Sequence, residues 1–288
     1  MICFFDSELE RLLADDVPFG DLTTDQLGLA GAAGRMDFSA RGAMVPALVE
    51  AAARLLELAG AKVALSARSG DALAAGAPIL SAQGPAPALL RGWKVAQTLI
   101  EIWSGVASAT RDIVEEARAA SPDICVAGTR KNTPGTKKFA AAAVESGGAV
   151  MHRLGLSETI LVFPEHLAFL PGASLEEIAT KLRRQSPEKK LAIEVKSHDQ
   201  ALAAARAGFH LIQAEKFSPA EIARLAGALR GLHGRPLLAA AGGVKRDNAR
   251  AYAEAGADIL VTSAPYSAAP KDVAVSFVVD CQASTPKL

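Results

Sequence analysis

The chain has 288 residues, of which 50% are apolar and 22% are charged, and its formal net charge at pH 7 is zero. A globular chain of this length is expected to form one large or two medium domains, with a sizeable core that needs neither metals nor disulfides. The neutral balance argues against nucleic acid as the main partner but leaves room for a local basic pocket that takes a small anion.

Cysteine spacing and hydropathy indicate a reduced protein that is not inserted in a membrane. The cysteines, Cys3, Cys125 and Cys281, lack zinc-ligand spacing, and Cys125 lies in an apolar run typical of a core. The opening residues MICFFDSELERLL carry early acidic residues and no basic segment, which does not fit a signal peptide. No window reaches the ~18 apolar residues of a membrane span, so we expect a cytoplasmic protein.

The first third of the chain predicts a mixed α/β region. Its expected elements are helices at 6–15 and 46–59 and strands at 35–41, 62–66 and 77–82. The run DVPFGDLTT has turn chemistry, in which Asp21 is placed to cap a helix. The pattern from 87 to 120 is helical, with a break expected near Ser104-Gly105.

Strands and helices alternate in the rest of the chain. The expected strands span 124–127, 160–163, 191–195, 211–214, 236–240 and 259–262. The helices that separate them include 174–184, 199–207, 219–229 and 246–255. Such alternation predicts a parallel sheet that closes into a β/α barrel. A dinucleotide-binding fold is less favoured, because no G-x-G-x-x-G follows the first strand.

Polar residues gather directly after the expected strands, where the loops of a β/α barrel build the active site. They are Arg130, Lys131, His152, Arg153, Glu194, Lys196, Glu215, Lys216, Gly242, Gly243 and Ser263. The cations would repel one another in one cavity unless a multiply anionic ligand offsets them. The alternative is a set of solvated ion pairs around the rim of the barrel.

The glycines and acids of this set indicate two kinds of subsite. Gly242 and Gly243 end a strand and open a helix, so their N–H groups can seat a phosphate together with the turn at Ser263. Glu194 and Glu215 can hold Mg²⁺ on a diphosphate or stabilise a cationic sugar carbon. Ion pairing of these acids with the neighbouring lysines is the alternative.

The histidines are less informative. His152 either donates to a carboxylate or simply packs in the structure. The others, which lack a metal-like or triad-like grouping, we interpret as structural or exposed: His166, His198, His210 and His233. No serine or cysteine nucleophile motif occurs in the sequence.

Several motifs follow one another along nearly the whole chain: GDLTT, SGVAS, TRKNTPGTK, GGAVMHRLGLSE, Glu194-Val195, and GGV with the turn after ILVTS. Together they resemble the quinolinate phosphoribosyltransferase family, or carboxylating nicotinate-nucleotide pyrophosphorylases. The resemblance implies an open-faced α/β sandwich at 1–105 and a partly open β/α barrel of six or seven parallel strands at 106–267. Residues 268–288 are expected to pack back on the first domain. The family resemblance also implies a homodimer that transfers phosphoribose from phosphoribosyl pyrophosphate to quinolinate, with Mg²⁺.

The resemblance implies roles by position. The expected substrate-binding residues are Lys94, Arg130, Lys131, His152, Arg153, Lys196 and Lys216, with Lys94 offered to the neighbouring subunit's site. The expected catalytic residues are Glu194, Glu215 and Lys131, and the two glutamates would also hold the metal. The expected seat of the 5′-phosphate is Gly242, Gly243 and Ser263.

The sequence departs from the family pattern mainly where the acceptor would bind. Phe163 stands for a lysine that touches substrate, and Lys94 stands for an arginine. Glu215, Lys216 and Ala241 stand where the family usually has Asp, Asn and Ser. A missing charged contact costs about 2–5 kcal/mol, enough to change the preferred acceptor.

The segments LVFPEH and QAEKF look like the ModD proteins, a branch of this family associated with molybdenum utilisation. Because the phosphate half of the site is kept better than the acceptor half, we predict a phosphoribosyltransferase whose nitrogen-heterocycle acceptor is not quinolinate. Two alternatives stay open. One is a true quinolinate enzyme of NAD biosynthesis, and the other is a non-catalytic anion-binding protein, with molybdate as a conceivable ligand.

Overall fold

The computed structural model describes residues 2–279, so Cys281 lies outside the described residues. The chain forms two compact units. The first contains the described residues up to Ser108, the segment Lys138–Gly148 and the described residues from Ala268 onward. The second contains Ala109–Lys137 and Ala149–Ser267. The sequence-based boundaries kept residues 138–148 with the barrel, whereas the structure gives them to the first unit.

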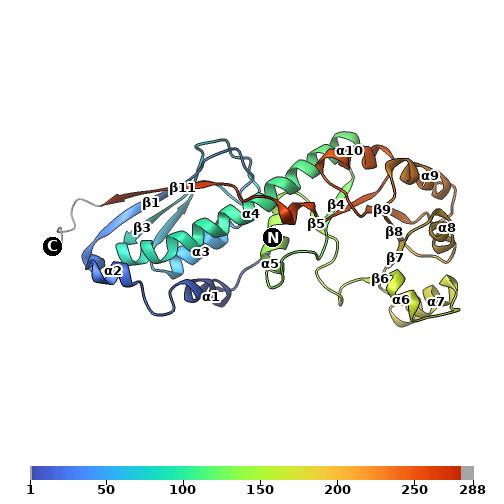
Figure 1. The fold of residues 1–288 in the computed structure, drawn as a ribbon, viewed down its shortest axis with the longest axis horizontal. Helices are drawn as coiled ribbons and strands as arrows, with labels where there is room; N and C mark the ends of the chain where they lie inside the picture. Colours follow the sequence, from blue (N-terminus) through green and yellow to red (C-terminus); the bar gives the residue numbers. More distant parts are fainter. Residues whose placement is uncertain (1, 280–288) are drawn as a thin grey trace. The chain divides into compact units, whose positions relative to one another are not determined.

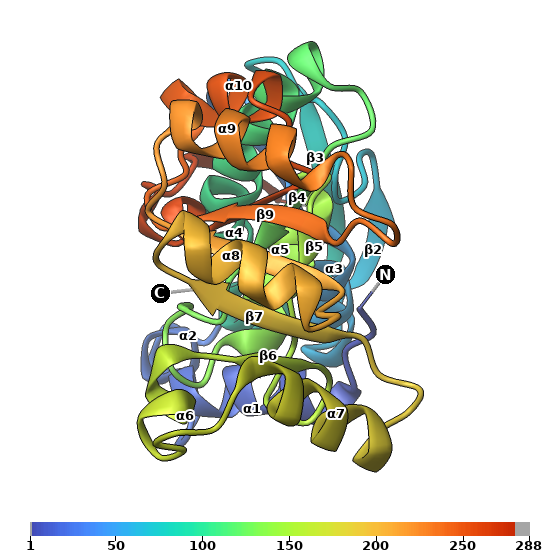
Figure 2. The same cartoon turned by 90° about the vertical axis from the view of Figure 1, so that its right-hand side faces the viewer.

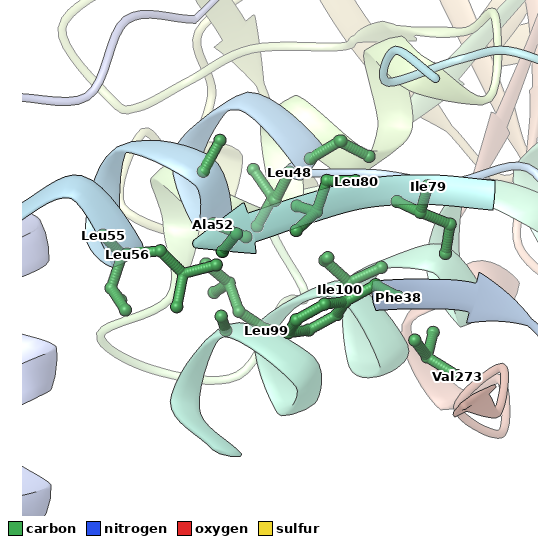
Figure 3. Packing of buried hydrophobic residues seen from close by; sticks show 14 of the residues in the cluster. Phe38, Leu48, Ala52, Leu55, Leu56, Ile79, Leu80, Leu99, Ile100 and Val273 are labelled. Atoms are coloured by element: carbon green, nitrogen blue, oxygen red, sulfur yellow. The ribbon is translucent and has the colours of Figure 1, made fainter. Parts of the chain in front are cut away.

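The first unit contains a four-stranded antiparallel sheet in the order β11-β1-β3-β2 (Figure 1). Its strands are β1 (Ala33–Ala40), β2 (Lys62–Leu65), β3 (Pro78–Pro85) and β11 (Val273–Val279). Burial largely alternates along β1, which is the pattern of a sheet with one covered face. The core beside this face includes Phe38, Leu55, Leu80, Ile100 and Val273 (Figure 3).

The helices of the first third largely follow the sequence pattern. They are α1 (Asp6–Asp16), α2 (Leu22–Gln26), the 3-10 helix η1 (Leu29–Gly31) and α3 (Val49–Leu58). Asp21 caps α2 as expected, because its Oδ1 accepts a hydrogen bond from the backbone N–H of Thr24 at 3.1 Å.

The long helix α4 (Ala86–Ala120) has no break, so the break expected near Ser104-Gly105 is wrong. Gly105 instead allows a close backbone approach, because a Cβ there would collide with the carbonyl oxygen of Ala269. The Oγ of Ser104 accepts a hydrogen bond from the N–H of Ala47 at 3.0 Å. These small residues serve tertiary packing, and the helix formers around them keep the helix continuous. Helix α5 (Lys137–Ser146) follows.

The second unit contains a seven-stranded parallel sheet in the order β5-β4-β10-β9-β8-β7-β6. The strands are β4 (Cys125–Gly128), β5 (Val150–Met151), β6 (Ile160–Val162), β7 (Leu191–Val195), β8 (Leu211–Glu215), β9 (Leu237–Ala241) and β10 (Ile259–Thr262). Strands β5 and β6 end this order and do not pair with each other, so the barrel is partly open. The α/β fold predicted from the sequence, a sandwich followed by a partly open barrel, is confirmed.

Helices cover one side of these strands (Figure 2). They are α6 (Pro164–Ala168), α7 (Leu175–Gln185), α8 (His198–Arg206), α9 (Pro219–Leu229) and α10 (Arg246–Glu254), followed by the 3-10 helix η2 (Ala264–Ser267). On β7 the residues Leu191, Ile193 and Val195 are fully buried and alternate with Glu194, which therefore points to the other face. No helix in the described part of the chain is both long and apolar enough to cross a membrane.

Candidate active site

A cavity of about 730 Å³ lies at the carboxyl ends of the parallel strands of the second unit. Residues in or just after each of the seven strands line it, from Thr129 after β4 to Ser263 after β10. Small side chains on the inner face, such as Ala241, leave room for it. A volume of this size suits a small-molecule ligand, and its position is where β/α barrels place their active sites.

Two neighbouring strands place Glu194 and Gln213 side by side on this face. The Nε2 of Gln213 donates a hydrogen bond of 2.7 Å to Oε2 of Glu194. Burial raises the pKa of Glu194, the hydrogen bond from Gln213 opposes this, and the carboxylates of Glu215 and Glu165 raise the pKa further. The cavity therefore concentrates negative charge along β6, β7 and β8.

The side chain of Glu215 packs closely against Gly242 in the turn after β9. A Cβ on Gly242 would lie 2.6 Å from Oε1 of Glu215 and 2.7 Å from Cγ of Lys216, so only glycine fits without moving them. Lys216 has a φ of 60°, and its N–H donates to the carbonyl of Ala241 at 2.7 Å. The backbone is therefore left-handed immediately after Glu215, a conformation that is uncommon for a residue other than glycine.

The cationic side of the cavity contains Arg130, Lys131 and Arg153. Arg153 is 5% exposed, and its guanidinium carbon lies 5.4 Å from the centroid of the Phe163 ring. Among the described residues it forms no ion pair. Burial lowers the pKa of Arg153, and the positive charge of Arg130 lowers it further. A buried cation without a carboxylate partner is suited to bind an anionic ligand.

His152 lines the cavity beside these cations. Burial and the charge of Arg153 lower the pKa of His152, which favours its neutral imidazole, and the carboxylate of Glu158 opposes this. A neutral imidazole can donate one hydrogen bond and accept another, but it adds no positive charge to this side of the cavity.

The turns after β9 and β10 also contribute to the lining of the cavity. Gly242, Gly243 and Ser263 all line the cavity. The side chain of Asn248 fixes the first turn, because its Nδ2 donates to the carbonyl of Gly243 and its Oδ1 accepts from the N–H of Lys245. The N-terminus of α10 begins there, and a helix N-terminus next to a glycine turn favours phosphate.

The structure does not bring every expected residue into this cavity. Lys196 and Lys216 are absent from its described lining. Lys94 belongs to the first unit, where its Nζ donates to Gln97 at 2.9 Å and lies 4.1 Å from the centroid of the Trp93 ring. Lys216 has a left-handed backbone, and Lys94 was expected at the neighbouring subunit's site, which stays a prediction.

Sequence reasoning missed several lining residues, including Glu165, Gln213 and Lys245. His166 was interpreted as structural or exposed. Its Nδ1 does accept a hydrogen bond from the N–H of Phe163 at 2.9 Å, but His166 also lines the cavity. Gln213 could have been found from its spacing, because it precedes Glu215 by two residues and so lies on the same strand face.

Comparison with known proteins places this site in a family. The family model "Quinolinate phosphoribosyl transferase, C-terminal domain" matches residues 106–276, and the N-terminal domain model of the same family matches residues 21–104. A protein of Rhodobacter capsulatus named "Putative pyrophosphorylase ModD" is 46% identical over 86% of this chain and 96% of its own length.

Two further matches are a human relative and a solved crystal structure. The human nicotinate-nucleotide pyrophosphorylase [carboxylating] is 32% identical over 76% of this chain and 74% of its own length. The crystal structure of NadC from Streptococcus pyogenes matches with a TM-score of 0.86 and 26% identity, over 95% of this chain and 96% of that one.

Proposed function

The chain belongs to the quinolinate phosphoribosyl transferase family, and we propose that it transfers phosphoribose from phosphoribosyl pyrophosphate to a nitrogen heterocycle other than quinolinate. The observation that carries the proposal is the contact of Arg153 with Phe163. An aromatic ring occupies the place where the family resemblance leads us to expect a lysine. The acids and the glycine turn of the cavity are retained, while the cationic clamp is reduced.

In the proposed reaction, one bond to the sugar carbon C1′ forms as another bond to C1′ breaks. The lone pair of the acceptor's ring nitrogen forms a bond to C1′ of phosphoribosyl pyrophosphate as the C1′–oxygen bond breaks. The electron pair of the broken bond leaves with pyrophosphate. Positive charge develops on C1′ and the ring oxygen in the transition state, and the carboxylates of Glu194 and Glu215 would stabilise it.

The turns after β9 and β10 would hold the 5′-phosphate. The backbone N–H groups of Gly242 and Gly243 and the hydroxyl of Ser263 are suitable donors, and the N-terminus of α10 adds partial positive charge. Lys131, which follows β4, the strand next to β10, would interact with the pyrophosphate and stabilise its growing negative charge.

The acceptor would bind next to His152, Arg153 and Phe163, which all line the cavity. Quinolinate carries two carboxylates, and this side of the cavity offers the partly screened cation Arg153 together with Arg130. Phe163 adds apolar surface instead of a third charge. An acceptor with fewer negative charges and a flat ring fits this lining better.

The donor set of the cavity is compatible with Mg²⁺. Glu194 and Glu215 offer the carboxylate oxygens that Mg²⁺ prefers, and the described residues contain no cluster of three or more metal-ligating side chains. Protein carboxylates would therefore hold the ion together with oxygens of the substrate. Bound there, Mg²⁺ would neutralise charge on the pyrophosphate group.

We also propose that the functional form is a homodimer whose subunits share active sites. Lys94 supports this, because it is the position that the family resemblance assigns to the neighbouring subunit's site and it lies on the first unit of its own chain. Size-exclusion chromatography with light scattering checks the oligomeric state. A Lys94→Ala variant that remains dimeric but loses affinity for substrate would support sharing, and an unchanged KM would count against it.

The test of the acceptor half is the Phe163→Lys variant, assayed for pyrophosphate release with quinolinate. Restoring the missing cation should raise kcat/KM for quinolinate by at least about 30-fold, the equivalent of a 2 kcal/mol contact. The matched control is Phe169→Lys, which places the same new charge on an exposed ring outside the cavity. Equal quinolinate activity in the wild type and both variants would refute the assignment of Phe163.

The Glu215→Ala variant separates an enzyme from an anion-binding protein. Turnover should fall by orders of magnitude, because the carboxylate that stabilises the sugar cation is lost. A protein that only binds an anion would instead bind it as well or better without this negative charge. Titration calorimetry with pyrophosphate, together with the turnover assay, distinguishes the two outcomes.

A further inference from the structure

The hydroxyl group of Tyr266 links the turn after β10 to the turns after β4 and β5. Tyr266 lies in η2, the short helix that follows Ser263. Its Oη donates a hydrogen bond of 2.7 Å to the carbonyl oxygen of Thr129 and lies 3.7 Å from Sδ of Met151. Because Tyr266 is not among the described residues that line the cavity, its hydroxyl contacts the protein and not a ligand.

Both contacts of this hydroxyl lie at the start of a turn that carries positive charge into the cavity. Thr129 directly follows β4, and Met151 is the last residue of β5. The residues that come next along the chain all line the cavity: Arg130, Lys131, His152 and Arg153. A single side chain therefore contacts the starting points of both turns.

The turn after β4 has few other hydrogen bonds to the rest of the barrel. The N–H of Thr129 donates to the carbonyl oxygen of Thr262 at 2.9 Å. Beyond Thr129, the described hydrogen bonds of this turn join its own residues, such as the bond of 3.2 Å from the N–H of Lys131 to Oγ1 of Thr129. Removing the Tyr266 hydroxyl would leave the partly buried Thr129 carbonyl without this donor, which costs more than the hydrogen bond itself contributes.

The charges on these turns favour a neutral donor at this place. Burial and the positive charge of Arg130 lower the pKa of Arg153, so the two guanidinium groups repel each other before an anion binds. Burial raises the pKa of Tyr266 to about 12, so its hydroxyl keeps its proton at neutral pH and can donate. A neutral hydroxyl holds the turns without pairing with their cations, whereas a carboxylate would pair with them.

We propose that Tyr266 is a positioning residue, which holds the turns after β4 and β5 so that their cations can bind one anionic ligand together. It acts through its contacts with Thr129 and Met151 and touches no reacting group. This inference rests on the proposed transfer function, which supplies the pyrophosphate that Lys131 and its neighbours would bind. The glycine turn after β9 would hold the 5′-phosphate independently of this hydroxyl.

The test is titration calorimetry of the full chain and its Tyr266→Phe variant, without Mg²⁺, with pyrophosphate and ribose 5-phosphate as probes. The substitution removes only the Oη atom. The Kd of pyrophosphate should rise about tenfold or more, because the turn that carries Lys131 loses this anchor. The Kd of ribose 5-phosphate should stay within about threefold, because its phosphate would bind the turns after β9 and β10. A substitution that only lowered stability would not separate the two probes.

The matched control is Tyr252→Phe, which removes the same atom from a tyrosine of the same unit. The Oη of Tyr252 donates to the carbonyl oxygen of Phe217 at 2.9 Å, in the turn after β8. Tyr252 is also not among the described residues that line the cavity. Both variants should lose a similar amount of stability in urea unfolding, but only Tyr266→Phe should lose affinity for pyrophosphate.

An unchanged Kd of pyrophosphate in Tyr266→Phe would overturn the inference. An equal loss of affinity for both probes, or the same loss in Tyr252→Phe, would mean that the hydroxyl serves only general stability and would overturn it as well. The inference also fails if the unsubstituted chain does not bind pyrophosphate. If the pyrophosphate result is as expected but the protein transfers phosphoribose to no acceptor, the proposed function fails and the positioning role of Tyr266 stands.

Discussion

Replacing Gly242 by alanine should separate backbone strain from damage to the active site. Gly242 has a φ of +82°, a conformation that costs an L-residue about 1–2 kcal/mol. The new Cβ would also lie 2.6 Å from Oε1 of Glu215 and 2.7 Å from Cγ of Lys216, well inside van der Waals contact. Glu215 must therefore shift, and a misplacement of about 1 Å at a reacting group costs on the order of 100-fold in rate.

The matched control is Gly172→Ala. Gly172 lies in the same unit with a φ of +84°, a Cβ added to it would meet no atom within 4 Å, and it does not line the cavity. Both variants should lose roughly 1–2 kcal/mol of stability in urea unfolding. Only Gly242→Ala should lose kcat/KM for pyrophosphate release, by on the order of 100-fold. Equal activity in the two variants would refute the claim that Gly242 positions a catalytic Glu215.

Three other substitutions test separate parts of the site. Glu165→Gln removes one of the charges that raise the pKa of Glu194. Since activity requires ionised Glu194, the acidic limb of the kcat/KM profile should move to lower pH. An acidic limb that stays in place would contradict this coupling. Arg153→Met should raise the KM of the acceptor about tenfold or more. It should leave the urea midpoint unchanged or higher, since the buried cation has no ion-pair partner among the described residues. A large loss of stability would mean that Arg153 is structural. Ser174→Ala removes the side chain that caps α7 and should cost about 1 kcal/mol in urea with kcat unchanged, and any comparable loss of kcat would show that α7 affects the site.

Sequence periodicity predicted most helices and strands of the second unit, whereas the sandwich and the partly open barrel were implied by the family resemblance. The strands at 191–195 and 259–262 and the helix at 219–229 were expected with the bounds that the structure shows, because each has apolar residues at the spacing of its element and a turn residue at its start or end. The continuous α4 was missed because glycine usually marks a break. At Gly105 its small size instead serves contact with Ala269, which is distant in sequence and invisible to local patterns.

The site was predictable where strand ends alone decide it. Arg130, Arg153, Glu194, Glu215 and the glycine turn line one cavity because parallel strands end at one edge of the sheet. Lys216 was expected to bind substrate, but it is absent from the described lining of the cavity, and its backbone is left-handed one residue after the strand. Sequence position does not reveal such a φ for a lysine, since this conformation is rare in residues other than glycine.

The contact between Arg153 and Phe163 shows a second limit of sequence reasoning. The sequence indicated only that Phe163 replaces a cation. The structure adds that its ring lies against the buried guanidinium, so the substitution both removes one charge and covers another. Gln213 could be placed on the cavity face from its spacing to Glu215, but its hydrogen bond to Glu194 on the neighbouring strand is visible only in the structure.

The most direct measurement is pyrophosphate release by the purified protein from phosphoribosyl pyrophosphate and Mg²⁺, with quinolinate and with a panel of other nitrogen heterocycles, and with product masses determined. We expect release with another heterocycle to exceed release with quinolinate by at least about tenfold in kcat/KM, and the product mass to equal the acceptor plus the phosphoribosyl group. Efficient release with quinolinate as the best acceptor would contradict the account.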